Sequence, residues 1–259
     1  MATLWPQYGH ITAEARGNVA LITLNRPGAA NALASTTVRE LADALAVVNR
    51  EESLRALVLT GSGNKVFCAG ADLKERRDNP GRDWEIRRPL LKFWNDLFTL
   101  PKPLVIAANG HGAGGGFELL MLADAVVVSE KAEFWLPEIQ WGGIPGGWGT
   151  QLLPRLVGPV RARWIALSGQ RLTARDLMEY GLATHCVAPE QVLGRALEAA
   201  QLLASRPAAA VAAAKEALRH ALSTALPTGV EVEDRLLQIA AASPDRQAGL
   251  ERFAKGERG

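Results

Sequence analysis

Short apolar runs typical of β-strands alternate with helix-like periodicity along the first half of the chain. Residues 11–16 and 19–24 favour strands, and Gly17-Asn18 between them is a pair typical of a tight hairpin turn. Three later runs are apolar almost throughout, as expected for strands covered on both faces: 56–60, 104–108 and 125–128. The pattern therefore predicts a strand hairpin followed by three buried strands.

Helical periodicity first appears between the predicted strands at 19–24 and 56–60. Apolar residues recur there every three or four positions, which places them on one helix face: Val38, Leu41, Leu45 and Val48. We expect Ser35 or Thr36 to cap this helix and the helix to continue to about Asn49. Strands separated by helical segments indicate right-handed crossover connections and a mostly parallel sheet, so the predicted fold class is α/β.

The pattern changes from about residue 159, where strand signals nearly vanish and Ala, Leu, Arg and Glu dominate. Five segments favour helices: 159–168, 173–179, 190–204, 207–222 and 228–241. Pro207 suits the start of its helix, because the N–H that proline lacks is not needed there. We therefore predict an α/β core over residues 1–190 and a helical region over residues 191–259.

Composition and charge exclude several classes of protein. The chain is 48% hydrophobic and 22% charged, as in ordinary globular domains, and its net charge of +2 is too small to define a nucleic-acid surface. Two cysteines, Cys68 and Cys186, make no disulfide framework, which favours a reducing compartment. No apolar stretch approaches the roughly 18 residues that cross a bilayer, and the N-terminus lacks a signal pattern. We expect a cytoplasmic protein without a membrane partner.

Two glycine-containing loops follow apolar strands, at residues 68–73 and 109–118. Ligands of open α/β folds bind beyond the carboxyl ends of strands, where both loops are expected to lie. Their backbone N–H groups would suit an oxyanion or a phosphate. A nucleotide phosphate is disfavoured, because no Gly-Lys-Ser/Thr and no ribose-binding acid follow. Each loop alone fits tight strand-to-helix packing equally well.

Two glutamates lie near these glycines. Glu118 falls in the first turn of the helix that the second loop opens, and Glu138 precedes another glycine-rich stretch at 142–147. Both have apolar neighbours, so burial should raise their carboxyl pKa values toward the range useful for acid–base catalysis. Either one alone is equally consistent with a helix-dipole partner or an ion pair. Together, beside two loops of oxyanion type, they favour a catalytic pair.

An ordered set of motifs identifies a family resemblance over essentially the whole length of the chain. The motifs are Asn25-Arg26-Pro27, Asn31-Ala32-Leu33, and the segments 67–73, 103–118, 137–139, 144–147, 149–151, 169–174 and 181–183. In this order they resemble the enoyl-CoA hydratase (crotonase) family. The resemblance implies a crotonase-like spiral of repeated ββα units with a C-terminal helical region that takes part in trimer formation. It further implies a homotrimer or a homohexamer built as a dimer of trimers.

The resemblance also implies residue roles. Glu118 and Glu138 would be catalytic, and the backbone N–H groups of Ala71 and Gly115 would form the oxyanion hole for the thioester carbonyl. Neither a metal nor a separate cofactor is implied, because coenzyme A is part of the acyl-CoA substrate. The positions expected to bind coenzyme A or the acyl group are Arg26, Ala32, Leu33, Ala69, Gly70, Asp72, Leu73, Lys74, Gly114, Pro137, Trp141, Phe253 and Lys255.

Retention of both glutamates favours hydration of a trans-2-enoyl-CoA to a 3-hydroxyacyl-CoA. An isomerase or a hydroxycinnamoyl-CoA-type hydratase-lyase remains an alternative on the same scaffold. Three tryptophans around the second glutamate would suit an aromatic acyl group or simply fill the core or a subunit interface: Trp135, Trp141 and Trp148. The sequence leaves open the acyl chain length and whether the thioester arises from fatty-acid, amino-acid or aromatic breakdown.

A cluster of basic residues follows the first glycine loop: Lys74, Arg76, Arg77, Arg82, Arg87 and Arg88. Such a cluster is usually a solvated face, and its position also suits contact with the phosphates of coenzyme A. Residues 71–76 resemble those of methylglutaconyl-CoA hydratases, some of which bind RNA. An RNA-binding relative without turnover is therefore an alternative of another class, although we do not expect nucleic acid to be the main partner.

Overall fold

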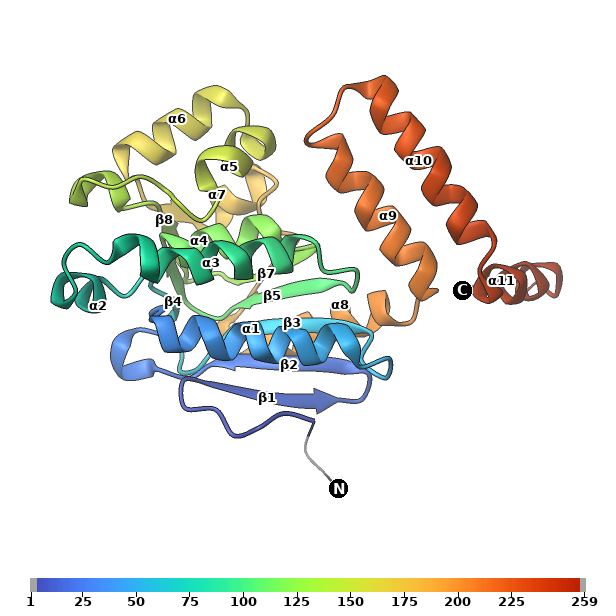
Figure 1. Cartoon of the computed structure of the whole chain (residues 1–259), viewed down its shortest axis with the longest axis horizontal. Helices are drawn as coiled ribbons and strands as arrows, with labels where there is room; N and C mark the ends of the chain where they lie inside the picture. The colour runs from blue at the N-terminus through green and yellow to red at the C-terminus, as the bar shows by residue number, and fades with distance from the viewer. Residues whose placement is uncertain (1–3, 257–259) are drawn as a thin grey trace.

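The chain forms a spiral in which each turn supplies one strand to a large sheet and the next strand to a small one (Figure 1). The computed structural model describes residues 4–256. The three complete turns pair β3 (Ala56–Gly61) with β4 (Val66–Cys68), β5 (Leu104–Ala108) with β6 (His111–Ala113), and β7 (Ala125–Ser129) with β8 (Glu133–Trp135). Helical segments follow each pair, which confirms the predicted repeat of ββα units.

The large sheet has six strands in the order β1-β2-β3-β5-β7-β10, and the small sheet has four in the order β4-β6-β8-β9. β1 (Ile11–Arg16) and β2 (Val19–Leu24) form the predicted antiparallel hairpin, with Gly17 at φ +63° in its turn. The remaining strands of the large sheet pair in parallel, ending with β10 (His185–Val187). β9 (Leu172–Thr173) closes the small sheet antiparallel to β8.

Helices occupy the predicted segments to within a few residues, and α2, α3, α5 and α11 are additional. The α-helices are α1 (Ser35–Arg50), α2 (Leu73–Asp78), α3 (Asp83–Phe98), α4 (Gly115–Glu118), α5 (Gly149–Val157), α6 (Pro159–Ser168), α7 (Ala174–Glu179), α8 (Val192–Ala204), α9 (Ala208–Ala221), α10 (Leu226–Ala241) and α11 (Pro244–Ala254). The 3₁₀ helices are η1 (Pro27–Ala29), η2 (Leu119–Leu122), η3 (Glu138–Trp141) and η4 (Pro189–Gln191). No helix between residues 4 and 256 is both long and apolar enough to cross a lipid bilayer.

The predicted cap of the first helix is wrong. Ala34 occupies the N-cap position of α1 and Ser35 is the first helical residue, so neither hydroxyl caps this helix. The backbone N–H of Ser35 instead donates to Oε2 of Glu75 from α2, at 2.9 Å. A carboxylate from a distant helix therefore satisfies a donor that sequence reasoning assigned to a local side chain.

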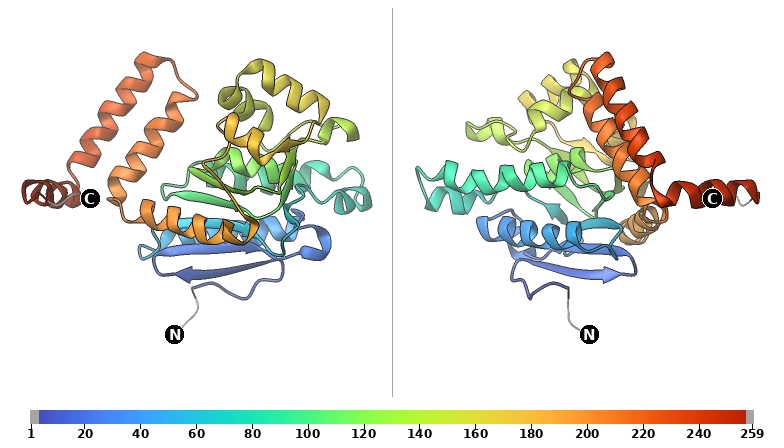
Figure 2. Two further views of the ribbon diagram at one scale, coloured as in Figure 1. Left: turned by 180° about the vertical axis from the view of Figure 1, so that it is seen from behind. Right: turned by 45° about the vertical axis from the view of Figure 1, so that its right-hand side comes forward.

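Alternate residues of β3 face two different layers, as a strand covered on both sides requires. Ala56 and Val58 belong to the cluster that packs against the small residues of α8, and the left view of Figure 2 shows α8 crossing this face of the sheet. Leu57 and Leu59 point the other way, into the main core beneath α1 and α3. This two-sided burial makes the large sheet a rigid base for the loops at its strand ends.

The last three helices extend away from the α/β core (Figure 1). α9 and α10 pack against one another, and Lys215 of α9 ties this pair to the core by donating to Oδ2 of Asp124 at 2.5 Å and to the carbonyl of Lys102 at 2.7 Å. The division at residue 190 remains a prediction. The first helix after it, α8, packs on the large sheet, whereas α9 to α11 do not.

Replacing Asp124 by Ala should destabilise the protein, because the Lys215 side chain is only 12% exposed and would lose its carboxylate partner. Breaking a buried ion pair from one side costs roughly 3–5 kcal/mol, which lowers the thermal midpoint of a chain this size by on the order of 10 °C. Asp96→Ala is the matched control, because Asp96 pairs with Lys92, whose side chain is 75% exposed. Equal midpoints for the two variants by calorimetry would contradict the prediction.

Candidate active site

The two predicted glycine loops touch at the carboxyl ends of β4 and β6. Gly70 has a φ of +81°, and a Cβ there would lie 2.6 Å from the carbonyl oxygen of Ala113 and 2.8 Å from the nitrogen of Gly115. Only glycine permits both the backbone angle and this close approach. Leu33 N–H donates to the carbonyl of Gly70 at 2.8 Å, so the segment before α1 lines the same place.

The backbone N–H groups of Ala71 and Gly115 lie where the loops meet. Neither donates a hydrogen bond to another residue within the described range 4–256, although both residues line one cavity. Buried N–H groups are nearly always paired, so two open donors at one cavity are suited to a ligand oxygen. Their role as an oxyanion hole remains a prediction.

Glu118 ends the short helix α4 and points into the interior, where it is 2% exposed. Its Oε1 accepts hydrogen bonds from the backbone N–H groups of Gly147 and Gly149, each at 2.8 Å. Trp148 between them has a φ of +71°, a left-handed angle that turns both N–H groups toward the carboxyl. A Cβ on Gly147 would lie 2.5 Å from Oε2 of Glu118, so glycine is required there.

Glu138 begins the 3₁₀ helix η3, which follows β8, and reaches the same cavity. Its Oε2 is buried and has no hydrogen-bond partner among the described residues. A Cβ on Gly114 would lie 2.7 Å from Oε1 of Glu138, so the φ +50° glycine before α4 also makes room for this carboxyl. An unsatisfied buried carboxylate oxygen is free to accept from a water or a substrate.

Burial shifts the pKa values of both carboxyls upward, as their apolar surroundings predict. The pKa of Glu118 rises from 4.5 to about 7, mainly because burial disfavours its charge and secondly because Glu138 is negative. The two backbone N–H donors and the charge of Arg87 only partly offset this. Burial likewise raises the pKa of Glu138, against the lowering influence of its own backbone N–H and of Arg76. The carboxyl of Glu118 is therefore suited to exchange protons near neutral pH.

One cavity of about 80 Å³ brings the predicted pairs together. Five of its lining residues were predicted from the sequence: Leu33, Ala71, Gly115, Glu118 and Glu138. Sequence reasoning gave no site role to Leu90, Ile144, Gly146 and Gly147, and it related Arg76 and Arg87 only to the phosphates of coenzyme A. We call this space the two-acid cavity.

Two members of the basic cluster are not part of a solvated face. Arg76 of α2 and Arg87 of α3 are half-buried and line the two-acid cavity, whereas Lys74, Arg77, Arg82 and Arg88 are exposed. The side chain of Arg87 reaches the cavity because of its position on α3, a helix that we did not predict from the hydrophobic pattern. The i, i+4, i+7 spacing of Ile86, Leu90 and Phe93 was the signal available for it.

Several predicted binding residues support the backbone around the site and do not line the two-acid cavity themselves. Arg26 donates to the carbonyl of Ala32 at 2.8 Å and to Oδ2 of Asp72 at 3.0 Å. Asp72 also caps α2 by accepting from the N–H of Glu75 at 3.1 Å, and these donors keep the pKa of Asp72 low despite its burial. Ala69 N–H donates to the carbonyl of Ala30 at 3.0 Å. These contacts hold the first glycine loop in place.

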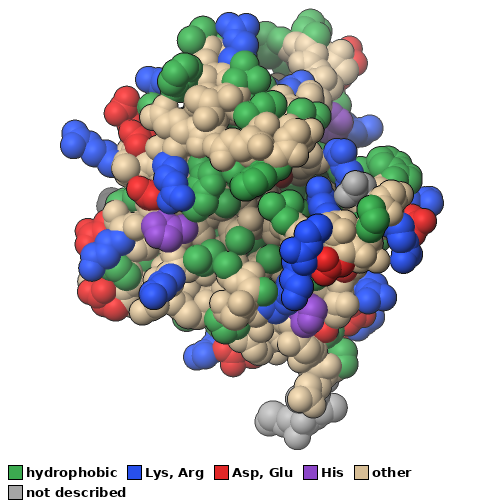
Figure 3. Space-filling view, turned by 90° about the vertical axis from the view of Figure 1, so that its left-hand side faces the viewer, with side chains coloured by type: hydrophobic (Ala, Val, Ile, Leu, Met, Phe, Trp, Pro, Cys, Tyr) green, Lys and Arg blue, Asp and Glu red, His purple; other side chains and the backbone are tan. Residues whose placement is uncertain are grey.

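Other predicted binding residues lie on the surface or elsewhere. Leu73 and Lys74 are exposed on α2. On the face of the molecule shown in Figure 3, hydrophobic side chains gather in the middle and Lys and Arg side chains flank them. Pro137 precedes Glu138 as the N-cap of η3. Phe253 and Lys255 lie at the end of α11, and within one chain they do not line the two-acid cavity. Their roles in binding coenzyme A remain predictions.

The three tryptophans do not form an aromatic acyl pocket around the two acids. Trp141 is 69% exposed, Trp148 packs edge-on against Phe98 with ring centroids 5.0 Å apart, and Trp135 lies under the guanidinium of Arg171 at 4.0 Å. None of them lines the two-acid cavity. The expected place of Trp141 in the site is therefore not supported by the geometry of one chain.

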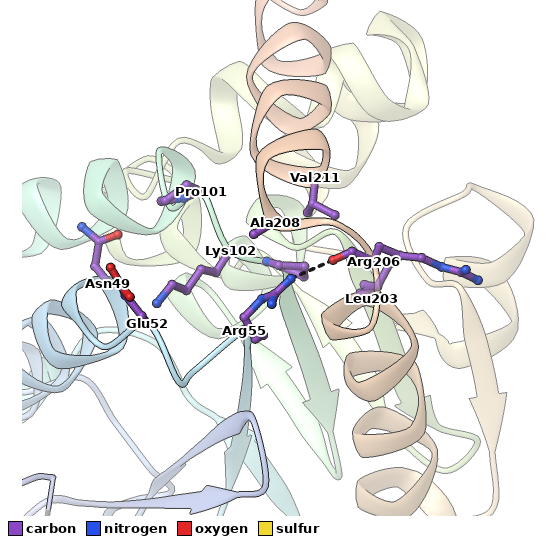
Figure 4. Close-up of a pocket in the computed structure, with 10 residues that line it drawn as sticks. Asn49, Glu52, Arg55, Pro101, Lys102, Leu203, Arg206, Ala208 and Val211 are labelled. Atoms are coloured by element: carbon purple, nitrogen blue, oxygen red, sulfur yellow. Dashed lines mark hydrogen bonds between the residues drawn. The ribbon is translucent and has the colours of Figure 1, made fainter. Parts of the chain in front are cut away.

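A larger cavity of about 420 Å³ lies between α1 and α9 (Figure 4). Two of its cationic side chains are already paired with backbone carbonyls. Lys102 Nζ donates to Val48 and Glu51, at 2.6 and 2.7 Å, and Arg55 donates to Arg206 at 2.9 Å. These contacts fasten helix ends to one another and leave no catalytic pair of acids. Size alone therefore does not identify the active site, and the smaller two-acid cavity is the better candidate.

Comparison with known proteins shows the family to which the chain is similar. The family model described as enoyl-CoA hydratase/isomerase matches residues 14–258. The mitochondrial enoyl-CoA hydratase of Pongo abelii is 38% identical over 251 residues, which cover 96% of this chain and 86% of that protein. The 2,3-dehydroadipyl-CoA hydratase of Escherichia coli is 39% identical over 236 residues, 91% of each chain. The crystal structure of an enoyl-CoA hydratase from Bacillus anthracis has a TM-score of 0.92 at 35% identity and covers 96% of this chain and 97% of that chain.

Glu118→Gln should make stability less dependent on pH. The pKa of Glu118 is about 7 in the folded protein against an ordinary 4.5, so between these values the unfolded chain ionises while the folded chain keeps its proton. The wild type therefore loses stability as pH rises through this window, by at most roughly 3 kcal/mol, and the loss is complete above it. Thermal midpoints should show a variant-minus-wild-type difference that grows from about pH 5 to pH 7.5 and then levels off. A difference independent of pH would refute the buried-acid assignment.

Proposed function

Because the chain belongs to the enoyl-CoA hydratase/isomerase family, we propose that it hydrates a trans-2-enoyl-CoA to a 3-hydroxyacyl-CoA. One observation carries the proposal: Glu118 and Glu138 line the same cavity as Ala71 and Gly115, whose N–H groups have no partner in the described residues. Hydration needs both elements, a pair of proton-exchanging groups and a site for negative charge on the thioester oxygen.

The two N–H groups would stabilise the enolate that forms as water adds. The thioester carbonyl oxygen accepts from Ala71 and Gly115, and negative charge grows on this oxygen during the reaction. Fixed donors therefore bind the transition state more strongly than the substrate, by about 3–4 kcal/mol per donor. The contact between Gly70 and Gly115 holds these two N–H groups in place, so they need little reorganisation when the enolate forms.

The two carboxyls would divide the proton transfers. A water held between them attacks C3 of the enoyl group and gives its proton to the ionised carboxylate. The other carboxyl, protonated, delivers a proton to C2 as the enolate collapses. One carboxyl must therefore be protonated and the other ionised, which the pKa of about 7 at Glu118 allows near neutral pH.

The alternatives predict different products. An isomerase moves the double bond without gaining water, and a hydratase-lyase cleaves the adduct, so mass analysis of the product separates both from a hydratase. The position of the three tryptophans outside the two-acid cavity gives no support to an aromatic substrate. An RNA-binding role loses support too, because Arg76 and Arg87 turn into this cavity instead of joining the exposed cluster.

Hydration should depend on both acids. Purified protein should remove the conjugated-thioester absorbance of crotonyl-CoA and yield a product heavier by one water. Glu118→Gln and Glu138→Gln should each lower kcat by roughly 100- to 10,000-fold, because each removes one proton-transfer group. Binding of the thioester should persist in both variants.

Glu133→Gln is the control, since Glu133 lies on β8 close to Glu138 in sequence but pairs with Arg171 at 2.8 Å. It should hydrate crotonyl-CoA at the rate of the wild type. Near-normal hydration in either catalytic variant would rule out the assigned pair, and an unchanged thioester with wild-type protein would rule out crotonyl-CoA as a substrate.

The proposal extends to assembly as a homotrimer or a hexamer. The three C-terminal helices expose large apolar side chains that water solvates poorly: Leu218, Leu222, Leu226, Val230, Leu237, Ile239, Leu250 and Phe253. Extended apolar surface of this kind is typical of protein interfaces. Light scattering behind size-exclusion chromatography should therefore give three or six times the mass of one chain. A monomer at micromolar concentration would contradict this part of the proposal.

A further inference from the structure

The two-acid cavity holds two arginines that neither transfer a proton nor bind the thioester oxygen in the proposed hydration. The Arg87 guanidinium donates to the carbonyl of Gly146 at 3.1 Å, which fixes it against one wall. Arg76 Nε is buried and has no hydrogen-bond partner among the described residues. A buried guanidinium nitrogen without an acceptor costs free energy, so an acceptor is expected when the site is filled.

The charges in the cavity do not balance during catalysis. Both guanidinium groups are always protonated and contribute two positive charges. The proposed reaction needs one protonated and one ionised glutamate, which together contribute one negative charge. The working site is therefore left with one uncompensated positive charge in a half-buried space, where an unpaired charge is unfavourable.

The two arginines lie where we expect the end of the acyl group that is farthest from the thioester. If the thioester oxygen binds between Ala71 and Gly115, C2 and C3 lie between Glu118 and Glu138. Carbons beyond C3 then enter the remainder of the cavity, which is lined by Arg76, Arg87, Leu90, Ile144 and Gly146. The coenzyme A phosphates are separated from the thioester by the whole pantetheine arm, so they do not reach these arginines when the thioester is in place.

From these observations we infer that the enzyme's substrate is a short 2-enoyl-CoA whose acyl group ends in a carboxylate, bound by Arg76 with Arg87 beside it. The inference rests on the proposed hydratase function and adds its substrate class, the mono-CoA thioester of an unsaturated dicarboxylic acid. A guanidinium is the side chain that best matches a carboxylate, through paired N–H···O bonds. The volume of about 80 Å³ restricts the chain to a few carbons beyond the double bond.

Two pairs of substrates of equal chain length test the inference. One pair is trans-2-pentenoyl-CoA and 4-carboxy-2-butenoyl-CoA, and the other is trans-2-hexenoyl-CoA and 5-carboxy-2-pentenoyl-CoA. For the wild-type protein, kcat/KM for hydration should be at least tenfold higher for the carboxylated member of at least one pair. The ratio between members, rather than either rate, is the readout, because Arg76 also influences the charge of Glu138.

Arg76→Gln should reduce this ratio at least tenfold, and Arg76→Lys should give an intermediate ratio because it keeps the charge and loses the paired donors. Arg77→Gln is the matched control, since Arg77 is the next residue of α2, is exposed and pairs with Asp78 at 2.9 Å. It should leave the ratio unchanged. Circular dichroism establishes that each variant is folded, and if Arg76→Gln is not, Arg76→Lys and the wild-type ratio decide.

The outcomes separate the two proposals. Hydration of the neutral thioesters with a wild-type ratio near or below one in both pairs keeps the hydratase function and overturns the inferred substrate class. An equal loss for both members in Arg76→Gln also overturns it, because Arg76 would then act only through Glu138. No hydration of any of the four thioesters contradicts the proposed function itself.

Discussion

A carboxyl group lies in the protein interior at Glu118, and much of the surrounding backbone is arranged to hold it. Two N–H groups from Gly147 and Gly149 bind one oxygen, and the left-handed Trp148 between them directs both donors inward. Trp94 of α3 fixes this turn by donating to the carbonyl of Gly147 at 2.6 Å. The start of α5, the path of α3 and the absence of side chains at two positions all follow from burying this one group.

The spiral makes this arrangement possible. Each turn sends one strand to the large sheet and the next to the small sheet, so consecutive loops end at the same edge. The first loop contributes Ala71, the second Gly115 and Glu118, and the third Glu138. Contact between these loops excludes side chains, and a Cβ on Gly116 would lie only 2.0 Å from the carbonyl oxygen of Cys68. Catalytic geometry and core packing therefore depend on the same close backbone contacts.

The electrostatics of the cavity connect mechanism with specificity. Burial raises both carboxyl pKa values, and the charge of Glu138 raises that of Glu118 further. Arg87 lowers the pKa of Glu118, and Arg76 lowers that of Glu138. The N–H donors of Gly149 and Gly147, and after them the charge of Arg87, limit the pKa of Glu118 to about 7. The same positive charge that tunes the acids is available to an anionic acyl group, so one pair of side chains serves both proton transfer and the inferred choice of substrate.

The sequence by itself determined most of the elements and the family. Apolar runs predicted five of the six strands of the large sheet, periodicity predicted most helices, and ordered motifs identified the family and gave the predicted roles of Ala71, Gly115, Glu118 and Glu138. These features are local, because residues close together in the sequence specify a strand, a helix face or a glycine loop. The cap supplied to α1 by Glu75, the inward turn of Arg76 and Arg87, and the outward position of Trp141 are not local. Only the tertiary structure decided them, because which side chain is desolvated and which donor meets which acceptor depend on segments far apart in the chain that the spiral brings together.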